Sequence, residues 1–160
     1  MPPDCPDDMR LHLASVKRKD VKRRLLVTWQ KRWKSSERGR TTFLWIPKVR
    51  LAASAGWRDF SREVTCLLTG HGHFNKRLFS FGFSDTPSCV CGEDEDWEHL
   101  LRDCPLYDQE RLQLVRSITS LRLYTDLPSI IRDPVATESL RIFAARVFSI
   151  RLGSEGPLDV

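Results

Sequence analysis

The chain of 160 residues lacks the long apolar run that a membrane helix requires. A helix that spans a bilayer takes about 20 predominantly apolar residues. The most apolar segment, LRIFAARVFSIRL at residues 140–152, is interrupted by Arg141, Arg146 and Arg151. The first ten residues, MPPDCPDDMR, also lack the basic and apolar regions of a secretory signal peptide. We therefore expect no membrane partner, and we expect the protein in the nucleus, the cytoplasm or both.

Cysteine is scarce, and its number is odd. Five cysteines fit a disulfide framework poorly, so we expect reduced thiols in a reducing compartment. The sequence also has no P-loop and no G-x-S-x-G, H-E-x-x-H or Tyr-x-Asp-Asp motif. It has no set of carboxylates spread over strands, as two-metal nuclease chemistry requires. The chain is therefore expected to hold no catalytic residues of its own.

Positive charge is concentrated in one segment near the start. Residues 17–40 hold eleven Lys and Arg residues against Asp20 and Glu37, a net charge of +9. Residues 1–16 and residues 41–160 each sum to −2, so the one segment accounts for the basic character of the whole chain. A block of this density favours a polyanionic partner, RNA or DNA. The alternative is a basic face that serves only solvation.

The basic segment is predicted to be helical. Residues 8–36 contain no Gly or Pro and favour one long helix. Val21, Leu25, Trp29 and Trp33 recur every four residues and form an apolar stripe. Either tryptophan could stack on an unpaired base, but their place on the stripe favours burial of both in the core. The expected nucleic-acid-binding residues of this helix are Lys17, Arg18, Lys19, Lys22, Arg23, Arg24, Lys31, Arg32 and Lys34.

The remaining segments are also mostly predicted as helices. Residues 41–51, TTFLWIPKVRL, are an exception, because they predict an extended segment that Pro47 limits to an edge or a loop. Helices are expected over 57–69 with Phe60, Val64, Leu67 and Leu68 inward, over 73–82 with Phe74, Leu78 and Phe79 inward, over 107–121 with Leu114, Val115, Ile118 and Leu121 inward, and over 136–152 with Leu140, Phe143, Ala144 and Val147 inward. Residues 126–134 predict a loop or a single turn.

Three of the five cysteines and one histidine fall within sixteen residues. Cys89, Cys91, His99 and Cys104 have the spacing C-x-C-x7-H-x4-C. Zinc takes four such ligands in a tetrahedron, and Gly92 allows the backbone to turn beneath the metal without a Cβ clash. The alternative is a buried cluster of small residues with an incidental histidine. The density of ligands favours one bound Zn²⁺.

The role predicted for this zinc is structural. Four protein ligands leave no open position for water, as a catalytic zinc would need. The loop between the ligands carries several acidic side chains, opposed by Arg102 alone, and would repel a phosphate backbone. We therefore expect a metal that holds the fold together. Direct nucleic-acid contact by this loop and a zinc-dependent enzyme remain the alternatives.

The other histidines give weaker signals. Cys66, His71 and His73 would be a second metal site only if they met in space, and a Gly-rich turn whose histidines bond the backbone is the simpler interpretation. His71 also counts among the candidate phosphate contacts. His12 is isolated and is expected at the surface.

These signals predict a mainly α fold: a helical domain with one small CCHC zinc-knuckle module inserted. The expected divisions are a basic helical segment at 1–40, a helical linker region at 41–84, the zinc knuckle at 85–106, C-terminal helices at 107–152 and a disordered tail at 153–160.

Two ordered sets of motifs occur along the chain. The first is a T-G-H-G turn, a short aromatic helix ending in F-G and a cysteine–histidine knuckle, in this order, and its residues are Thr69, Gly70, His71, Gly72, Phe74, Leu78, Phe81, Gly82, Cys89, Cys91, Gly92, His99, Leu101, Cys104 and Pro105. The second lies upstream and consists of Trp29, Gln30, Trp33, Gly39, Arg40, Thr41, Ile46 and Pro47. Together they resemble a known family, the C-terminal region of Pol polyproteins from non-LTR retrotransposons, and most of all the arthropod type-1 elements that insert in ribosomal DNA. The resemblance covers roughly residues 15–115.

The resemblance implies a polyprotein with an endonuclease and a reverse transcriptase that carries out target-primed integration. The chain is similar only to the part after the polymerase, so either activity would come from sequence outside it. The implied partners are RNA, DNA and the remainder of the polyprotein. We expect a nucleic-acid-associated domain in which the basic helix positions template RNA or target DNA. The alternative is a protein-interaction module whose acidic knuckle docks on a basic partner.

Overall fold

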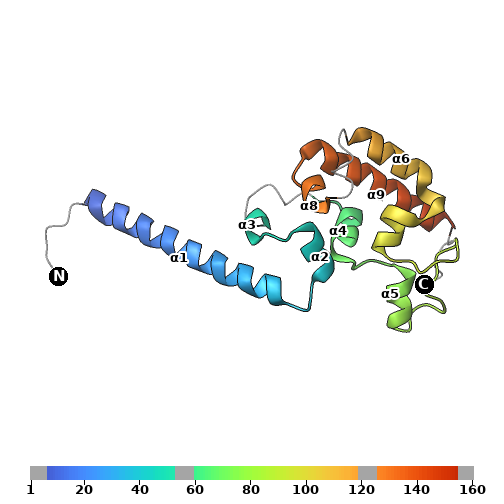
Figure 1. The fold of residues 1–160 in the computed structure, drawn as a ribbon, viewed down its shortest axis with the longest axis horizontal. Coiled ribbons are helices and arrows are strands. Elements are labelled where there is room, and N and C mark those ends of the chain that lie inside the picture. Colours follow the sequence, from blue (N-terminus) through green and yellow to red (C-terminus); the bar gives the residue numbers. More distant parts are fainter. Residues whose placement is uncertain (1–6, 53–59, 119–125, 155–160) are drawn as a thin grey trace.

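The computed structural model describes residues 7–52, 60–118 and 126–154, and in these ranges the chain forms helices and no strand (Figure 1). In chain order the helices are α1 (Asp7–Ser35), α2 (Arg40–Trp45), α3 (Val49–Ala52), α4 (Arg62–Thr69), α5 (Asn75–Ser80), η2 (His99–Asp103), η3 (Pro105–Tyr107), α6 (Asp108–Ser117), α8 (Leu127–Ile130) and α9 (Pro134–Ser154). η2 is a π-helical turn and η3 is a 3-10 turn. The prediction of a mainly α fold is confirmed.

α1 extends away from a body that contains most of the other helices (Figure 1). Within the body, α9 lies side by side with α6 and also contacts α4 and α8. α2 contacts α4 and α8, and α3 contacts α1. In the described residues, no helix is both long enough and apolar enough to cross a bilayer.

The C-terminal end of α1 is fastened to the segment that follows α2. The Gln30 side-chain amide donates to the Pro47 carbonyl at 2.9 Å, and its oxygen accepts the Val49 N–H at 2.9 Å. The Trp33 indole N–H donates to the Ile46 carbonyl at 2.7 Å. The predicted single long helix is confirmed, and these bonds fix how it leaves the body.

The predicted burial of Trp29 in the core is wrong, and two other members of the apolar stripe on α1 are exposed as well. Val21 is 55% exposed, Leu25 is 63% exposed and Trp29 is 48% exposed, whereas Trp33 is half-buried. The following segment packs against the face that carries Gln30 and Trp33. It leaves the neighbouring face, with Leu25 and Trp29, uncovered by the described residues.

Residues 41–51 are also different from the prediction, because they contain α2 and α3 and no extended segment. Gly39 has φ 70°, a left-handed conformation that turns the chain from α1 into α2. α2 then buries Trp45 completely, with its ring centroid 5.9 Å from that of Trp97. Burial of this large side chain outweighs the local preference for a strand. The helix ends at Trp45, because the next residue, Ile46, precedes a proline and a residue in that position disfavours helical backbone.

One hydrophobic core joins the helices to the cysteine segment. It includes Cys89, Trp97, Leu100, Leu101 and Cys104 together with Leu140, Phe143, Ala144 and Val147 of α9. The cysteine segment is thus inserted in the chain between helices, and its buried side belongs to the common core.

Most of the predicted inward positions are confirmed. The buried ones are Val64, Leu67, Leu68, Phe74, Leu114, Ile118, Leu140, Phe143, Ala144 and Val147, and Phe60, Leu78 and Val115 are half-buried. The prediction is wrong for Phe79, which is 49% exposed, because Phe74 and Leu78 occupy the inward face of the short α5. Leu121 and residues 57–59 lie outside the described residues, as does the side chain of His12.

The end of the chain is partly different from the prediction. The single turn expected within 126–134 is α8. α9 continues to Ser154, so the first two residues of the expected disordered tail are helical, and 155–160 lie outside the described residues. The division of the chain into five segments stays a prediction.

Candidate metal centre

Cys89 and Cys91 lie on a tight turn. The Cys89 N–H donates to the Glu93 carbonyl at 2.7 Å, and the Gly92 N–H donates to the Cys89 carbonyl at 2.9 Å. Gly92 has φ +100°, which L side chains rarely adopt, whereas a Cβ there would meet nothing within 4 Å. The turn therefore needs this glycine for its backbone conformation, and the predicted Cβ clash is not the reason.

His99 and Cys104 are brought to one side of the chain by the π-helical turn η2. The Cys104 N–H donates to the His99 carbonyl at 2.8 Å. In an α-helix with 3.6 residues per turn, a residue five positions on would lie about 140° further round; the wider π turn reduces that angle. Asp96 caps the start of this turn, since its Oδ1 accepts the N–H groups of Glu98 and His99 at 3.1 and 3.0 Å. These bonds place the last two candidate ligands opposite the first two.

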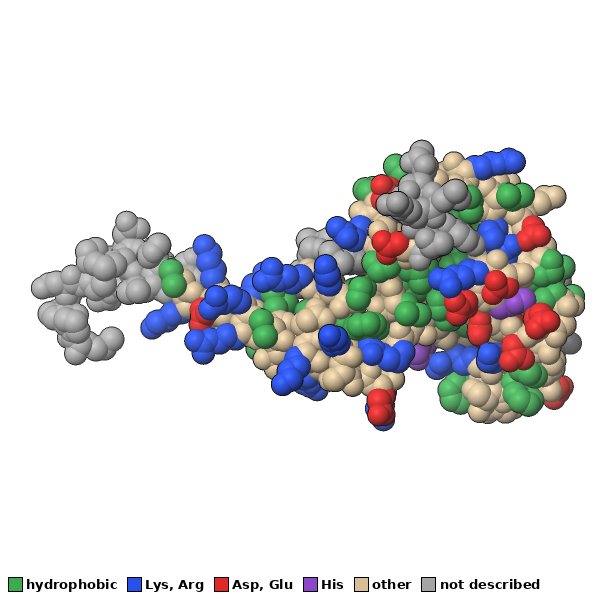
Figure 2. Space-filling model, in the orientation of Figure 1, with side chains coloured by type: hydrophobic (Ala, Val, Ile, Leu, Met, Phe, Trp, Pro, Cys, Tyr) green, Lys and Arg blue, Asp and Glu red, His purple; other side chains and the backbone are tan. Residues whose placement is uncertain are grey.

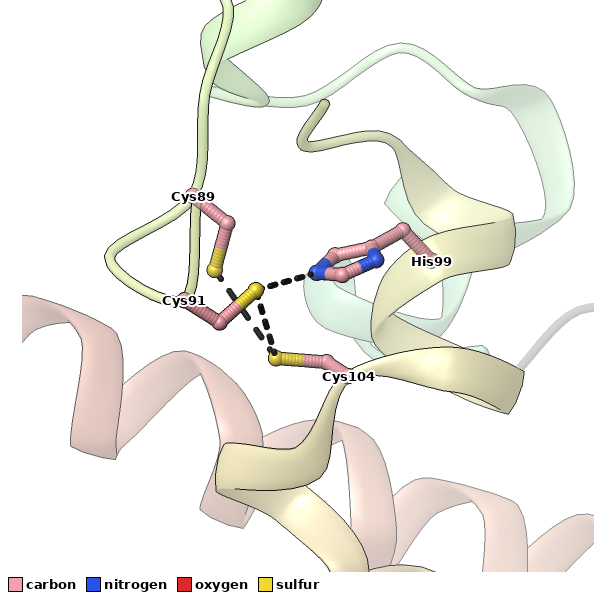
Figure 3. A group of neighbouring side chains, drawn as sticks. All are labelled: Cys89, Cys91, His99 and Cys104. Carbon is pink, nitrogen blue, oxygen red and sulfur yellow. Dashed lines mark hydrogen bonds between the residues drawn. The ribbon is translucent and has the colours of Figure 1, made fainter. Parts of the chain in front are cut away.

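The four side chains point toward a common centre (Figure 3). The Cys104 Sγ lies 3.8 Å from the Cys89 Sγ and 3.9 Å from the Cys91 Sγ, and the Cys91 Sγ lies 3.3 Å from the His99 Nε2. All four ligand atoms lie within 4.8 Å of one another. With Zn–S near 2.3 Å and Zn–N near 2.0–2.1 Å, tetrahedral ligands are roughly 3.6–3.8 Å apart. The cluster therefore has the dimensions to hold a metal ion.

The surroundings of the Cys89 and Cys104 thiols keep these two protonated in the absence of metal. Cys89 and Cys104 are buried, His99 is 8% exposed and Cys91 is half-buried. Burial raises the pKa of the Cys89 thiol, and it raises the pKa of Cys104 to about 12. A metal ion binds thiolates, so it must displace these protons.

Glu95 and Arg151 form a buried ion pair beside the metal centre that the sequence analysis missed. Arg151 Nη2 lies 2.6 Å from Glu95 Oε1, and Arg151 Nε lies 3.2 Å from Oε2, with the side chains 6% and 3% exposed. Glu95 Oε1 also accepts the Asn75 N–H at 3.0 Å, and Arg151 donates to the His73 carbonyl at 2.7 Å. The available signal was that Arg151 follows Val147 by four residues on the buried stripe of α9.

Other acidic side chains around the cysteines are also paired. Asp94 and Asp96 each lie 3.3 Å from Lys76 Nζ, and Glu98 lies 2.6 Å from Arg102 Nη1. Three cations therefore oppose the acidic loop, where the sequence predicted Arg102 alone. The loop is a weaker barrier to phosphate than its composition indicates, and a poorer docking site for a basic partner.

The T-G-H-G turn after α4 has a packing role. The His71 Nδ1 lies 2.8 Å from the Thr69 carbonyl oxygen, and the His71 side chain is exposed. A Cβ on Gly72 would lie 3.0 Å from atoms of Cys66 and Phe74, so close packing requires glycine there. In the described part of the chain, Cys66, His71 and His73 do not gather as metal ligands. The simpler interpretation, a turn with backbone-bonded histidine, agrees with this geometry for His71.

All nine basic residues of α1 that the sequence singles out have exposed side chains, namely Lys17, Arg18, Lys19, Lys22, Arg23, Arg24, Lys31, Arg32 and Lys34. Arg23 and Arg24 pair with Asp20 at 2.8 and 2.9 Å. Among the described residues, the other seven have no ion pair. Lys and Arg side chains occur along α1, whereas acidic side chains gather on the body (Figure 2). α1 therefore presents largely uncompensated positive charge to solvent.

Comparison with known proteins shows which proteins the chain is similar to. The chain is 37% identical over 147 residues, 91% of its length, to a Retrovirus-related Pol polyprotein from type-1 retrotransposable element R1 of Bradysia coprophila. It is 40% identical over 126 residues, 78% of its length, to a putative 115 kDa protein in type-1 retrotransposable element R1DM of Drosophila melanogaster. The chain is homologous to part of the R1-type retrotransposon Pol polyproteins. A third relative, a Retrovirus-related Pol polyprotein from type-1 retrotransposable element R1 3 of Nasonia vitripennis, is 42% identical over 90 residues, 54% of the chain.

The chain spans 15%, 12% and 23% of the lengths of these three R1-type relatives. It therefore corresponds to a small part of a much longer polyprotein. No family model and no solved structure matches it. The predicted resemblance to R1-type Pol polyproteins is confirmed, and several motif residues that carried it have structural roles: Gln30 and Trp33 fasten α1, and Gly72 permits close packing.

Proposed function

We propose that this segment of the Pol polyprotein is a nucleic-acid-associated domain. In this proposal α1 positions template RNA or target DNA, and one structural zinc ion stabilises the body from which α1 extends. Reverse transcription and DNA cleavage would belong to the remainder of the polyprotein, which is the proposed protein partner.

The exposed cations of α1 are the observation that carries the proposal. A helix of 29 residues is roughly 43 Å long at about 1.5 Å per residue. Lys and Arg side chains along such a helix can neutralise successive phosphates of a nucleic-acid backbone. Neutralisation of the phosphates releases the counterions condensed on them. Since seven of the nine have no acidic partner in the described part of the chain, binding would not first have to break internal ion pairs.

The candidate metal centre supports a structural role for zinc. Three thiolates and one imidazole are a preferred ligand set for Zn²⁺, and four protein ligands fill its tetrahedron. The ligand atoms belong to residues that are mostly buried in the common core. Such a site has no open position for a substrate or a reactive water, so the alternative of a zinc-dependent enzyme is not favoured.

The alternative of a protein-interaction module receives less support. It requires an acidic surface on the knuckle, but Glu95 is buried against Arg151, and Asp94, Asp96 and Glu98 have cationic partners. The strongest uncompensated charge in the described residues is positive and lies on α1.

Charge reversal on α1 tests the proposal. The variant with Arg18→Glu, Lys22→Glu and Arg23→Glu should bind RNA and DNA more weakly, and the slope of log affinity against log salt should fall by about two to three. The matched control reverses Arg62, Arg116 and Arg132, three exposed arginines of the body, and makes the same change in formal charge. If both variants lost the same affinity, only net charge would matter, and the assignment of α1 would be wrong.

A further inference from the structure

One face of α1 combines cations with exposed apolar side chains. Arg18, Lys22, Leu25, Trp29 and Arg32 are separated by four, three, four and three residues. Residues spaced in this way lie on one face of an α-helix. We call this surface the Trp29 face. At about 1.5 Å per residue it runs for roughly 21 Å.

The two apolar members of the Trp29 face are open to solvent. Trp29 is 48% exposed and Leu25 is 63% exposed. Arg18, Lys22 and Arg32 are exposed as well, and none of them has an ion pair within the described ranges. Tryptophan is usually among the most buried residues of a protein. An indole left open between three cations therefore points to a ligand that combines an apolar surface with negative charge.

A hollow of about 440 Å³ lies at the Trp29 face. It is lined by Leu25, Thr28, Trp29, Arg32, Trp33 and Ser36. Trp33 is held in place, because its indole N–H is bonded to the Ile46 carbonyl. The hollow thus has one fixed aromatic wall, one exposed indole and one guanidinium group. Stacking on aromatic rings, with cation–π support from arginine, is how proteins hold unpaired bases.

We infer that the Trp29 face binds single-stranded nucleic acid, with Trp29 stacked on an unpaired base and Arg18, Lys22 and Arg32 on the flanking phosphates. This inference rests on the proposed function and limits its ligand to single-stranded RNA or DNA. In a duplex the faces of the bases are covered by their neighbours, so only the cations would contribute. An apolar helix from a protein partner would cover Trp29 and Leu25 but would leave the three cations without counter-charge, which is why the occupant is assigned as a polyanion.

The test compares single strands with duplexes. Trp29→Ala should weaken binding of single-stranded RNA and DNA oligonucleotides by about 5- to 150-fold, the range found for loss of one base–aromatic stack. Its affinity for duplex DNA and its salt slope should stay the same, because no cation is removed. Trp29→Phe should retain most of the single-strand affinity. The control is Val27→Ala, which truncates a side chain that is 64% exposed and is two residues away from the Trp29 face in sequence, so it points elsewhere.

Fluorescence gives a second readout. Single strands should quench the tryptophan emission of the unaltered chain, and most of this quenching should be absent in Trp29→Phe although the strand still binds. Equal weakening of single-strand and duplex binding by Trp29→Ala, or no weakening of either, would overturn the inference. Charge reversal separates the two claims. If the α1 reversal weakens binding while Trp29→Ala does not, only the inference fails, and if neither does, the proposed function fails as well.

Discussion

Glu95 connects three parts of the chain through one carboxylate. It receives Arg151 from α9 in two contacts, and it receives the backbone N–H of Asn75 at the start of α5. Both charged groups are almost completely removed from water, where an unpaired ion is costly. The pair therefore holds the cysteine turn, α5 and the end of α9 in one relative arrangement.

Removing either partner of this pair should be strongly destabilising. Glu95→Ala or Arg151→Ala should each lower the free energy of unfolding by about 3–5 kcal/mol, because each leaves a buried charge without its counter-ion. The double variant should lose much less than the sum of the two. Denaturant unfolding of the four proteins gives this coupling directly. The partly exposed pair Glu98–Arg102, whose side chains are 47% and 34% exposed, is the control cycle, with an expected coupling of about 0.5 kcal/mol. If the losses in free energy of unfolding for the Glu95 and Arg151 variants were additive in the double variant, the two side chains would not be energetically coupled.

The buried thiols give metal binding a pH dependence of known sign. Burial raises the pKa of Cys89 above its ordinary value of 9.0, and it raises the pKa of Cys104 to about 12. At pH 7 both are neutral, so zinc binding should release protons and the apparent affinity should rise with pH. Calorimetric titration in two buffers of different ionisation enthalpy measures the proton release. A binding enthalpy that is the same in both buffers, or an affinity that stops rising below pH 8, would contradict the assignment of these thiols.

At the scale of elements, Gln30 makes two of the bonds that fasten α1 to the body. The Gln30 amide satisfies both a carbonyl and an N–H of the Pro47–Val49 segment. Unlike the exposed cations around it, this group is part-buried, so its loss leaves two backbone groups unsatisfied.

Gln30→Ala should therefore loosen the junction while α1 stays helical. The expected cost is about 1–3 kcal/mol locally, since a donor and an acceptor lose their partners. Hydrogen exchange should become faster for the Val49 amide and its neighbours in α3, with little change in α6 and α9. Lys31→Ala, at an exposed neighbouring position, should leave the exchange of α3 unchanged. An unchanged exchange rate in Gln30→Ala would mean that Trp33 alone holds the junction.

The sequence correctly predicted those features of each element that depend on the local pattern of residues. Periodicity predicted the helical ranges of α1 and α9, and the structure agrees with them. Spacing predicted that Cys89, Cys91, His99 and Cys104 lie together, and the structure brings these four candidate ligands together. The path of 41–51 and the exposure of Trp29 could not be predicted in this way, because each depends on which surface the body offers. The burial of Glu95 could not be predicted for the same reason. It lies in an acidic loop that the sequence places at the surface, and its partner Arg151 lies 56 residues away.

At the scale of the whole molecule, the candidate metal centre and the helices share a single core. Cys89 and Cys104 are buried in the same cluster as Leu140, Phe143 and Val147 of α9. A metal that fixes these cysteines would therefore stabilise the contacts of α9 as well as the cysteine turn. Only the C-terminal end of α1 meets the body. A metal that stabilises the body would therefore also stabilise the orientation in which α1 projects from it.

The zinc content of the purified chain tests this account most directly. We expect about one zinc per chain, and far less in Cys104→Ser together with a lower thermal midpoint and reduced helicity. Cys66→Ala alters a buried cysteine outside the metal centre, so it should keep its zinc. An unaltered chain that carries no zinc, or a Cys104→Ser variant that keeps both its zinc and its stability, would contradict the account.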